Sequence, residues 1–233
     1  MTDGQVNTEP FSPAGDLHDL CTFCAEIEGR DEHNLLRRLL GPDVGTSYLL
    51  AETENFVLIP GVGSLMPGYL LAVPRPHVLS FGHLPVQLAA ELDELLGRAE
   101  RWIRRLYGRG TLMFEHGPAS FVERGGSCTD HAHLHVVPCP PGVDLLPGME
   151  RDFEVRPGGG MLETAHEQIG SGRGPYLFLR QPSGSSYVCD APTAMSQYLR
   201  RDLVTQCGME GEWDWEVFPG TDQIRETIGS FDG

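Results

Sequence analysis

The spacing of apolar residues predicts one long helix over residues 85–107. Apolar side chains in this stretch fall at helical spacing and would share one side of the helix, and Gly108 is a typical helix end. The apolar positions are Leu88, Leu92, Leu95, Leu96 and Ile103. Shorter helices are expected at 31–40, 162–169 and 193–207, with one more near the C-terminal end of the sequence.

Short apolar runs bounded by turn residues predict strands. They lie at 47–52, 54–60, 69–74 and 111–117, followed by a hairpin made of 175–180 and 186–190. This order of elements favours an α+β protein with an antiparallel sheet and flanking helices over residues 18–149. Residues 150–233 are expected to form a C-terminal α/β extension that packs on it, and residues 1–17, rich in glycine, proline and polar residues, a disordered leader.

Residues 130–138 read DHAHLHVVP, with three histidines at alternating positions. Because successive side chains of a strand point to opposite faces, His131, His133 and His135 would share one face, roughly 7 Å from one to the next. A helix would scatter them around its axis, so the pattern predicts a strand. Ordinary strands rarely carry three histidines on one face for packing reasons alone. We therefore expect this strand to hold the functional site.

Cys21 and Cys24 form a Cys-x-x-Cys pair. Two further ligands would complete a tetrahedral zinc site, and the candidates are His77, just after the apolar strand 69–74, and His131. Such a Cys2His2 set would hold zinc structurally, because it leaves no open coordination position, and this disfavours a catalytic zinc on the histidine strand. The alternative for the two cysteines is a buried or redox-active pair.

The charge of the chain narrows the class of ligand. With 17 basic and 33 acidic residues the formal net charge is −16, which argues against a basic face for nucleic acid. A small anionic ligand remains compatible if imidazoles, backbone N–H groups and a few arginines build its site locally. No apolar run reaches the length of a membrane span and no signal segment is recognisable, so we expect a cytoplasmic protein that binds neither nucleic acid nor a membrane.

The segments CTFC, PGYLLAVPRPH and GGSCTDHAHLHVVP, in this order, resemble the histidine-triad (HIT) superfamily of nucleotidyl hydrolases and transferases. FEHG and GSCTDHAH are similar to elements of its galactose-1-phosphate uridylyltransferase branch. The resemblance implies a HIT-like catalytic domain over 18–149 and a small-molecule nucleotide as ligand, and it is compatible with a homodimer. It also implies a zinc ion on Cys21, Cys24, His77 and His131.

The resemblance gives the middle histidine, His133, the role of nucleophile. A neutral imidazole attacks phosphorus near pH 7 and leaves readily once it carries a phosphoryl group, so a nucleotidyl-histidine intermediate is expected. Ser127 and His135 would bind phosphate oxygens, and N–H groups of the turn at Gly126 would add donors. His116 occupies the position of the family's usual asparagine and is a further candidate phosphate contact.

The region after residue 150 offers additional candidate phosphate contacts. These are Arg180, Gln197, Arg200 and Arg201. The loop 59–68 has no carboxylate at the place where many small family members hold the ribose hydroxyls. The family's hydrolases carry histidine in the third motif position and its transferases typically glutamine, so His135 implies net hydrolysis that releases a nucleoside monophosphate. The alternatives are a nucleotidyltransferase or dinucleotide phosphorylase, and a nucleotide-binding module without turnover.

Overall fold

An antiparallel sheet organises the computed structural model, which describes residues 13–231. Within this range eight strands run in the order β1-β2-β3-β5-β4-β7-β8-β6, and each strand is antiparallel to its neighbours. Their bounds are β1 Ala51–Glu52, β2 Phe56–Pro60, β3 Leu70–Pro74, β4 Thr111–Gly117, β5 Leu134–Pro138, β6 Val155–Pro157, β7 Tyr176–Arg180 and β8 Ser186–Asp190. This arrangement confirms the predicted α+β class with an antiparallel sheet.

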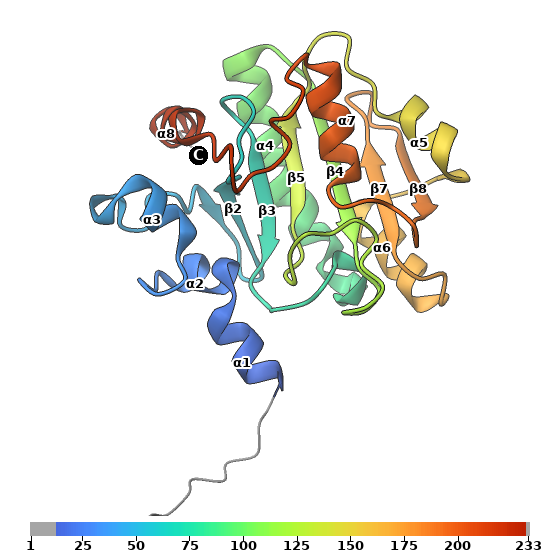
Figure 1. The fold of residues 1–233 in the computed structure, drawn as a ribbon, viewed down its shortest axis with the longest axis horizontal. Coiled ribbons are helices and arrows are strands. Elements are labelled where there is room, and N and C mark those ends of the chain that lie inside the picture. The colour runs from blue at the N-terminus through green and yellow to red at the C-terminus, as the bar shows by residue number, and fades with distance from the viewer. Residues whose placement is uncertain (1–12, 232–233) are drawn as a thin grey trace, which may run out of the picture.

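Helices cover both faces of the sheet. In Figure 1, α4 lies behind the strands and α7 in front of them. The helices are α1 Pro13–Leu20, α2 Thr22–Glu28, α3 Leu35–Leu40, α4 Ala89–Tyr107, α5 Leu146–Asp152, α6 Met161–Gly170, α7 Tyr198–Gln206 and α8 Thr221–Ser230. Short 3₁₀ turns lie at Pro42–Val44, Phe81–His83 and Val86–Leu88.

The sheet separates two hydrophobic cores. Helices α4 and α6 pack on one face, while α2, α3, α5, α7 and α8 contribute buried residues to the other. Strand β4 shows the alternation: Met113 belongs to the core under α4, and Phe114 to the core under α7. His135 lies between two residues of the α4 core, Leu134 and Val136, and therefore faces α7.

The histidine strand is shorter than the predicted span of 130–138. β5 begins at Leu134, so His131 and His133 lie in the segment that leads into it. There the N–H of Ala132 donates to the carbonyl of Val78 at 2.7 Å, beyond the end of β3. The chain therefore joins the β3 ladder only after His133.

The strands that follow residue 150 extend the same sheet. β7 pairs with β4 along its length, and β8 and β6 continue the sheet from there. The division between residues 149 and 150 stays a prediction, although hydrogen-bonded pairing runs across it. Of the predicted leader, residues 1–12 lie outside the described range, and residues 13–17 belong to α1. None of the helices in the described range is long and apolar enough to span a membrane.

Candidate functional site

A cavity that opens to solvent lies on the α7 side of the sheet. One part of its wall is mostly apolar and comes from α2, α3, β2 and β3, with Thr22 and Glu26 of α2 as its polar members. The other part is polar and comes from β4, β5, the 127–129 turn and the start of α7. The lining residues are Thr22, Phe23, Glu26, Leu35, Ile59, Pro60, Val62, Leu71, His116, Ser127, Cys128, Thr129, His133, His135, Gln197, Arg200 and Trp215.

The backbone fixes the orientation of His133 in this wall. Its Nδ1 lies 3.0 Å from the carbonyl oxygen of His131 and 3.2 Å from the hydroxyl of Thr129. The Thr129 hydroxyl donates to the His131 carbonyl at 3.1 Å, so toward Nδ1 of His133 both oxygens can only accept. Nδ1 of His133 therefore carries the ring proton. No hydrogen bond in the described part of the chain occupies Nε2. Burial lowers the pKa of His133 to about 4, so the ring is neutral at pH 7 with a lone pair on Nε2.

His135 has the opposite tautomer. Its Nδ1 lies 2.9 Å from the hydroxyl of Tyr69, whose oxygen also accepts from Nη1 of Arg200 at 3.5 Å. We assign the hydroxyl hydrogen of Tyr69 to Nδ1 of His135, since Arg200 already donates to the phenol oxygen, and this assignment places the ring proton on Nε2. Burial lowers the pKa of His135, and its ring stacks on Phe114 with centroids 4.4 Å apart. A nitrogen with a free lone pair and an N–H donor thus occupy neighbouring rings whose centroids are 4.9 Å apart.

His116 links the cavity to helix α7. Its Nε2 accepts the backbone N–H of Leu199 at 3.0 Å, which satisfies one of the free donors in the first turn of α7. Burial lowers the pKa of His116 to about 3, so the ring stays neutral and available as an acceptor.

The turn at Gly126 meets the start of α7 from the other side. The carbonyl of Gly126 accepts the N–H of Gln197 at 2.7 Å. Gly126 has φ +83°, and a Cβ there would lie 2.7 Å from the carbonyl oxygen of Met195, so the approach requires glycine. Ser127 lines the cavity, with its hydroxyl donating to the carbonyl of Thr129 at 3.0 Å.

Two of the arginines that the sequence suggested as phosphate contacts lie outside the cavity. Arg180 pairs in register with Met113 and forms an ion pair with Glu100 of α4 at 3.3 Å, on the opposite face of the sheet. The guanidinium of Arg201 lies 3.2 Å from the ring centroid of Trp213. The expectation that these two side chains reach over the site does not fit these positions. Gln197 and Arg200, in contrast, line the cavity.

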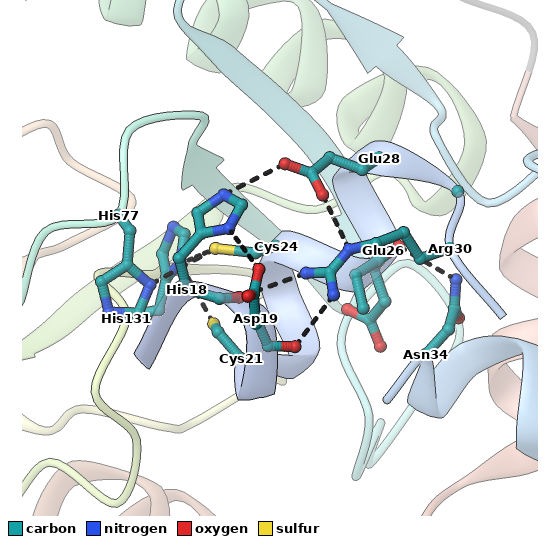
Figure 2. A network of polar contacts seen from close by, with 12 residues as sticks. His18, Asp19, Cys21, Cys24, Glu26, Glu28, Arg30, Asn34, His77 and His131 are labelled. Carbon is teal, nitrogen blue, oxygen red and sulfur yellow. Dashed lines mark hydrogen bonds and ion pairs between the residues drawn. The ribbon is translucent and has the colours of Figure 1, made fainter. Parts of the chain in front are cut away.

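The four predicted metal ligands converge beside the cavity (Figure 2). The ligand atoms of Cys21, Cys24, His77 and His131 all lie within 4.8 Å of one another. Nδ1 of His131 is 3.4 Å from Sγ of Cys21 and 3.5 Å from Sγ of Cys24, and Nδ1 of His77 is 3.3 Å from Sγ of Cys24. Sulfur and nitrogen ligands of a tetrahedral zinc ion lie roughly 3.5 Å apart, so the donor set fits zinc.

Hydrogen bonds around the four-residue cluster orient its ligand atoms and favour the binding of a cation. Nε2 of His131 donates to the carbonyl of Pro74 at 2.8 Å, which turns the lone pair of Nδ1 toward the cysteines. Hydrogen bonding by Cys24 lowers the pKa of Cys21 against the opposing effect of burial, which favours a thiolate. Outside the cluster, Glu28 joins His18 at 3.0 Å and Arg30 at 2.7 Å, which ties α1 to the end of α2 (Figure 2).

Three residues in or next to the cavity are not among the site residues predicted from the sequence. Tyr69 and Thr129 hold the two histidine tautomers, and Glu26 brings a carboxyl group from α2 into the wall. Glu26 accepts the N–H of Leu36 at 3.1 Å, and burial raises its pKa to about 8. A sequence signal for Tyr69 does exist. Leu71 pairs with His135 across β3 and β5, and Tyr69, two positions earlier, falls on the same face as Leu71 by the alternation of a strand. Along the sequence Glu26 lies far from the loop 59–68, although Ile59, Pro60 and Val62 of that loop line the same cavity.

Neither a protein-family model nor a curated protein sequence matches this chain. Among solved structures, it is similar to a Zn-bound histidine triad family protein from Mycobacterium smegmatis, with 20% identity, a TM-score of 0.40 and coverage of 65% of this chain and 91% of that one. It is also similar to a hypothetical histidine triad nucleotide-binding protein from Sulfolobus tokodaii, with 23% identity, a TM-score of 0.39 and coverage of 53% and 71%. A HIT-like protein involved in cell-cycle regulation from Bartonella henselae gives 13%, 0.36 and coverage of 53% and 82%. Each similarity is confined to part of this chain.

Proposed function

We propose that this protein is a hydrolase that cleaves a nucleoside-phosphate anhydride or ester through a nucleotidyl group on His133. The observation that carries the proposal is the hydrogen bond from Nδ1 of His133 to the carbonyl of His131, which leaves Nε2 as a nucleophile in the cavity wall. The apolar part of the wall suits a base, and the polar part suits phosphate oxygens. The histidine pattern in the sequence supports the same chemistry.

The reaction has two steps. Nε2 of His133 attacks the α-phosphorus, the N–P bond forms, and the bond from phosphorus to the leaving-group oxygen breaks. That oxygen takes the proton from Nε2 of His135 while the Tyr69 hydroxyl passes its proton to Nδ1, so the ring stays neutral and the negative charge lies on the Tyr69 oxygen beside Arg200. A water molecule then attacks the phosphorus and gives a proton to Nε2 of His135, Nδ1 returns its proton to Tyr69, and the N–P bond breaks. The products are a nucleoside monophosphate and the free leaving group, and both rings return to their starting tautomers.

We propose that the Cys21, Cys24, His77 and His131 cluster binds one Zn²⁺. The distances between the donor atoms and the hydrogen bond to the Pro74 carbonyl support this assignment. With all four ligands from the protein, the ion would hold α2 and the segment of His77 against the start of the histidine strand, and would supply structural cross-linking rather than activated water.

The choice between water and another acceptor is tested with isotopically labelled water. A panel of nucleotide conjugates is incubated with the protein in H2¹⁸O, with and without inorganic phosphate or sugar phosphates. Hydrolysis predicts one ¹⁸O atom in the nucleoside monophosphate, and no requirement for a phosphorylated acceptor. Turnover that needs the acceptor and leaves the product unlabelled would make the protein a transferase, and nucleotide binding without turnover would make it a binding module.

A further inference from the structure

A buried positive charge without a carboxylate partner lies in the polar wall of the cavity. The side chain of Arg200 is 3% exposed, and its guanidinium donates to backbone carbonyls of Trp213 and Gly63, both at 2.7 Å, and of Glu212 at 3.4 Å. Its remaining contact is the Tyr69 hydroxyl at 3.5 Å. All of these acceptors are neutral, and no carboxylate among residues 17–231 forms an ion pair with Arg200.

This absence of a counter-ion contrasts with the composition of the chain. The protein carries 33 acidic residues against 17 basic ones, and other arginines, such as Arg156 and Arg180, do form ion pairs. A guanidinium taken out of water needs an anion to offset the loss of hydration. Because Arg200 lines the cavity, that anion can come from a ligand.

A second group in the same wall also lacks a partner. Gln197 is 7% exposed, and no hydrogen bond in the described part of the chain uses its side-chain amide: Oε1 is buried without a partner, and the Nε2 donors are free to bind an anion. Its backbone has φ +60° and ψ +34°, a left-handed conformation that residues other than glycine rarely adopt. The N–H of Gln197 donates to the carbonyl of Gly126 at 2.7 Å, so this amide is held at the cavity in spite of its backbone strain.

We propose that Arg200 and Gln197 form a binding subsite for a second phosphate group of the ligand, next to the phosphate that His133 attacks. Arg200 contacts Tyr69, which holds His135, the proton donor to the leaving group. The subsite therefore lies on the leaving-group side, and the protein selects phosphoanhydrides, whose leaving group is anionic, over esters of neutral alcohols. The position of the scissile phosphate rests on the proposed function, whereas the anion subsite itself does not.

Inorganic pyrophosphate is the probe for the subsite. Isothermal titration calorimetry of the full chain is expected to give binding that Arg200→Met weakens by roughly 10- to 100-fold, in line with the loss of a charged hydrogen bond. Arg201→Met is the matched control, because it removes the same charge from the next position and loosens the same Trp213 segment, but takes no charge from the cavity. It is expected to change the affinity by less than about 3-fold. Equal binding by wild type and Arg200→Met would overturn the proposal.

A second variant keeps the test decisive if Arg200→Met loses its fold by circular dichroism. Gln197→Asn withdraws the amide by one methylene group, while asparagine tolerates the left-handed backbone. This variant is expected to weaken pyrophosphate binding by roughly 5-fold or more, as one lost hydrogen bond implies. Unchanged affinity in a folded Gln197→Asn protein would contradict the subsite.

Turnover separates the subsite from the proposed function. Arg200→Lys is expected to lower kcat/KM for a nucleoside triphosphate that releases pyrophosphate more than for the p-nitrophenyl ester of the same nucleoside monophosphate. Equal losses for both substrates would overturn the leaving-group assignment. If neither compound turns over although pyrophosphate binds through Arg200, the proposed function fails and the anion subsite stands.

Discussion

His133 and His135 carry their ring protons on different nitrogens because their immediate neighbours differ. The His131 carbonyl accepts from Nδ1 of His133, whereas the Tyr69 hydroxyl donates to Nδ1 of His135. Both rings are therefore neutral before the reaction, one with a free lone pair for attack and the other with an N–H for proton donation. Each role depends on a separate hydrogen bond, so the two roles can be tested separately.

Replacement of His133 by asparagine should abolish turnover and preserve binding. The shorter amide can still donate to the His131 carbonyl but cannot attack phosphorus, so kcat should fall by roughly 10³-fold or more. The dissociation constant of the nucleoside monophosphate, measured by calorimetry, should change only a few-fold. Loss of binding together with turnover would show that His133 supports the structure rather than the chemistry.

Tyr69→Phe should weaken catalysis without loosening the fold. The variant removes the donor to Nδ1 of His135, so the proton of that ring is no longer directed to Nε2. We expect kcat to drop on the order of 10-fold with KM nearly constant, the effect of one lost hydrogen bond. ¹⁵N NMR of the His135 ring should show a shift toward the Nδ1-protonated tautomer, and an unchanged ring spectrum would contradict the role of Tyr69.

At the scale of elements, helix α7 completes the cavity although it begins 60 residues after the end of the histidine strand. Two contacts fix its first turn: His116 of β4 accepts from Leu199, and the turn at Gly126 accepts from Gln197. Both contacts come from segments that also bear candidate site residues. Segments of the site therefore hold the start of α7 and, with it, Arg200 in place.

The contact between β4 and α7 makes stability depend on pH. Burial lowers the pKa of His116 from 6.5 to about 3, so between these values the unfolded chain binds a proton that the folded chain does not. The stability that this group contributes is fully present above pH 6.5 and is lost as the pH falls toward 3, at about 1.4 kcal/mol per pH unit. His116→Asn keeps an acceptor for Leu199 but does not titrate, so urea unfolding from pH 6 to 4 should give it a shallower slope than wild type. Parallel curves would contradict this assignment.

Elements with strong local patterns could be predicted from the sequence. Features that depend on which strands pair, and in which register, could not. The strand at 111–117 matches β4 residue for residue, since its apolar run is closed by turn residues on both sides. Helix α2 was not predicted, because it occupies the metal motif and ends at Gly29 after only seven residues. Arg180 and Arg200 looked equivalent as phosphate contacts. Only the register of β7 on β4, which no local pattern encodes, turns Arg180 to the α4 face.

For the whole molecule, the metal cluster connects parts of the chain that lie far apart in the sequence. Cys21 and Cys24 belong to the α2 region, His77 follows β3, and His131 precedes β5. Phe23, between the two cysteines, packs on His133 with ring centroids 5.3 Å apart. A zinc ion at this cluster would therefore set the position of one cavity wall relative to the nucleophile.

Removal of zinc should lower the stability of the entire protein. Elemental analysis is expected to find about one zinc per chain, and chelation should reduce Tm by roughly 10 °C, because metal-binding energy is folding energy at such a site. Cys24→Ser should show the lower Tm without chelator. Cys207→Ser, a half-buried cysteine outside the cluster, is the control and should respond to chelation as wild type does. A metal-free protein with undiminished Tm would favour the redox pair instead.

The most direct test of the central claim is mass spectrometry of the covalent intermediate. The protein is mixed with the nucleotide conjugate that it turns over and quenched in alkaline denaturant, because an N–P bond to histidine hydrolyses in acid. We expect a nucleoside monophosphoryl group on the peptide that contains His133, localised to that residue by fragmentation and absent from His133→Asn. The same group on a different residue, or turnover by His133→Asn at the wild-type rate, would contradict the mechanism.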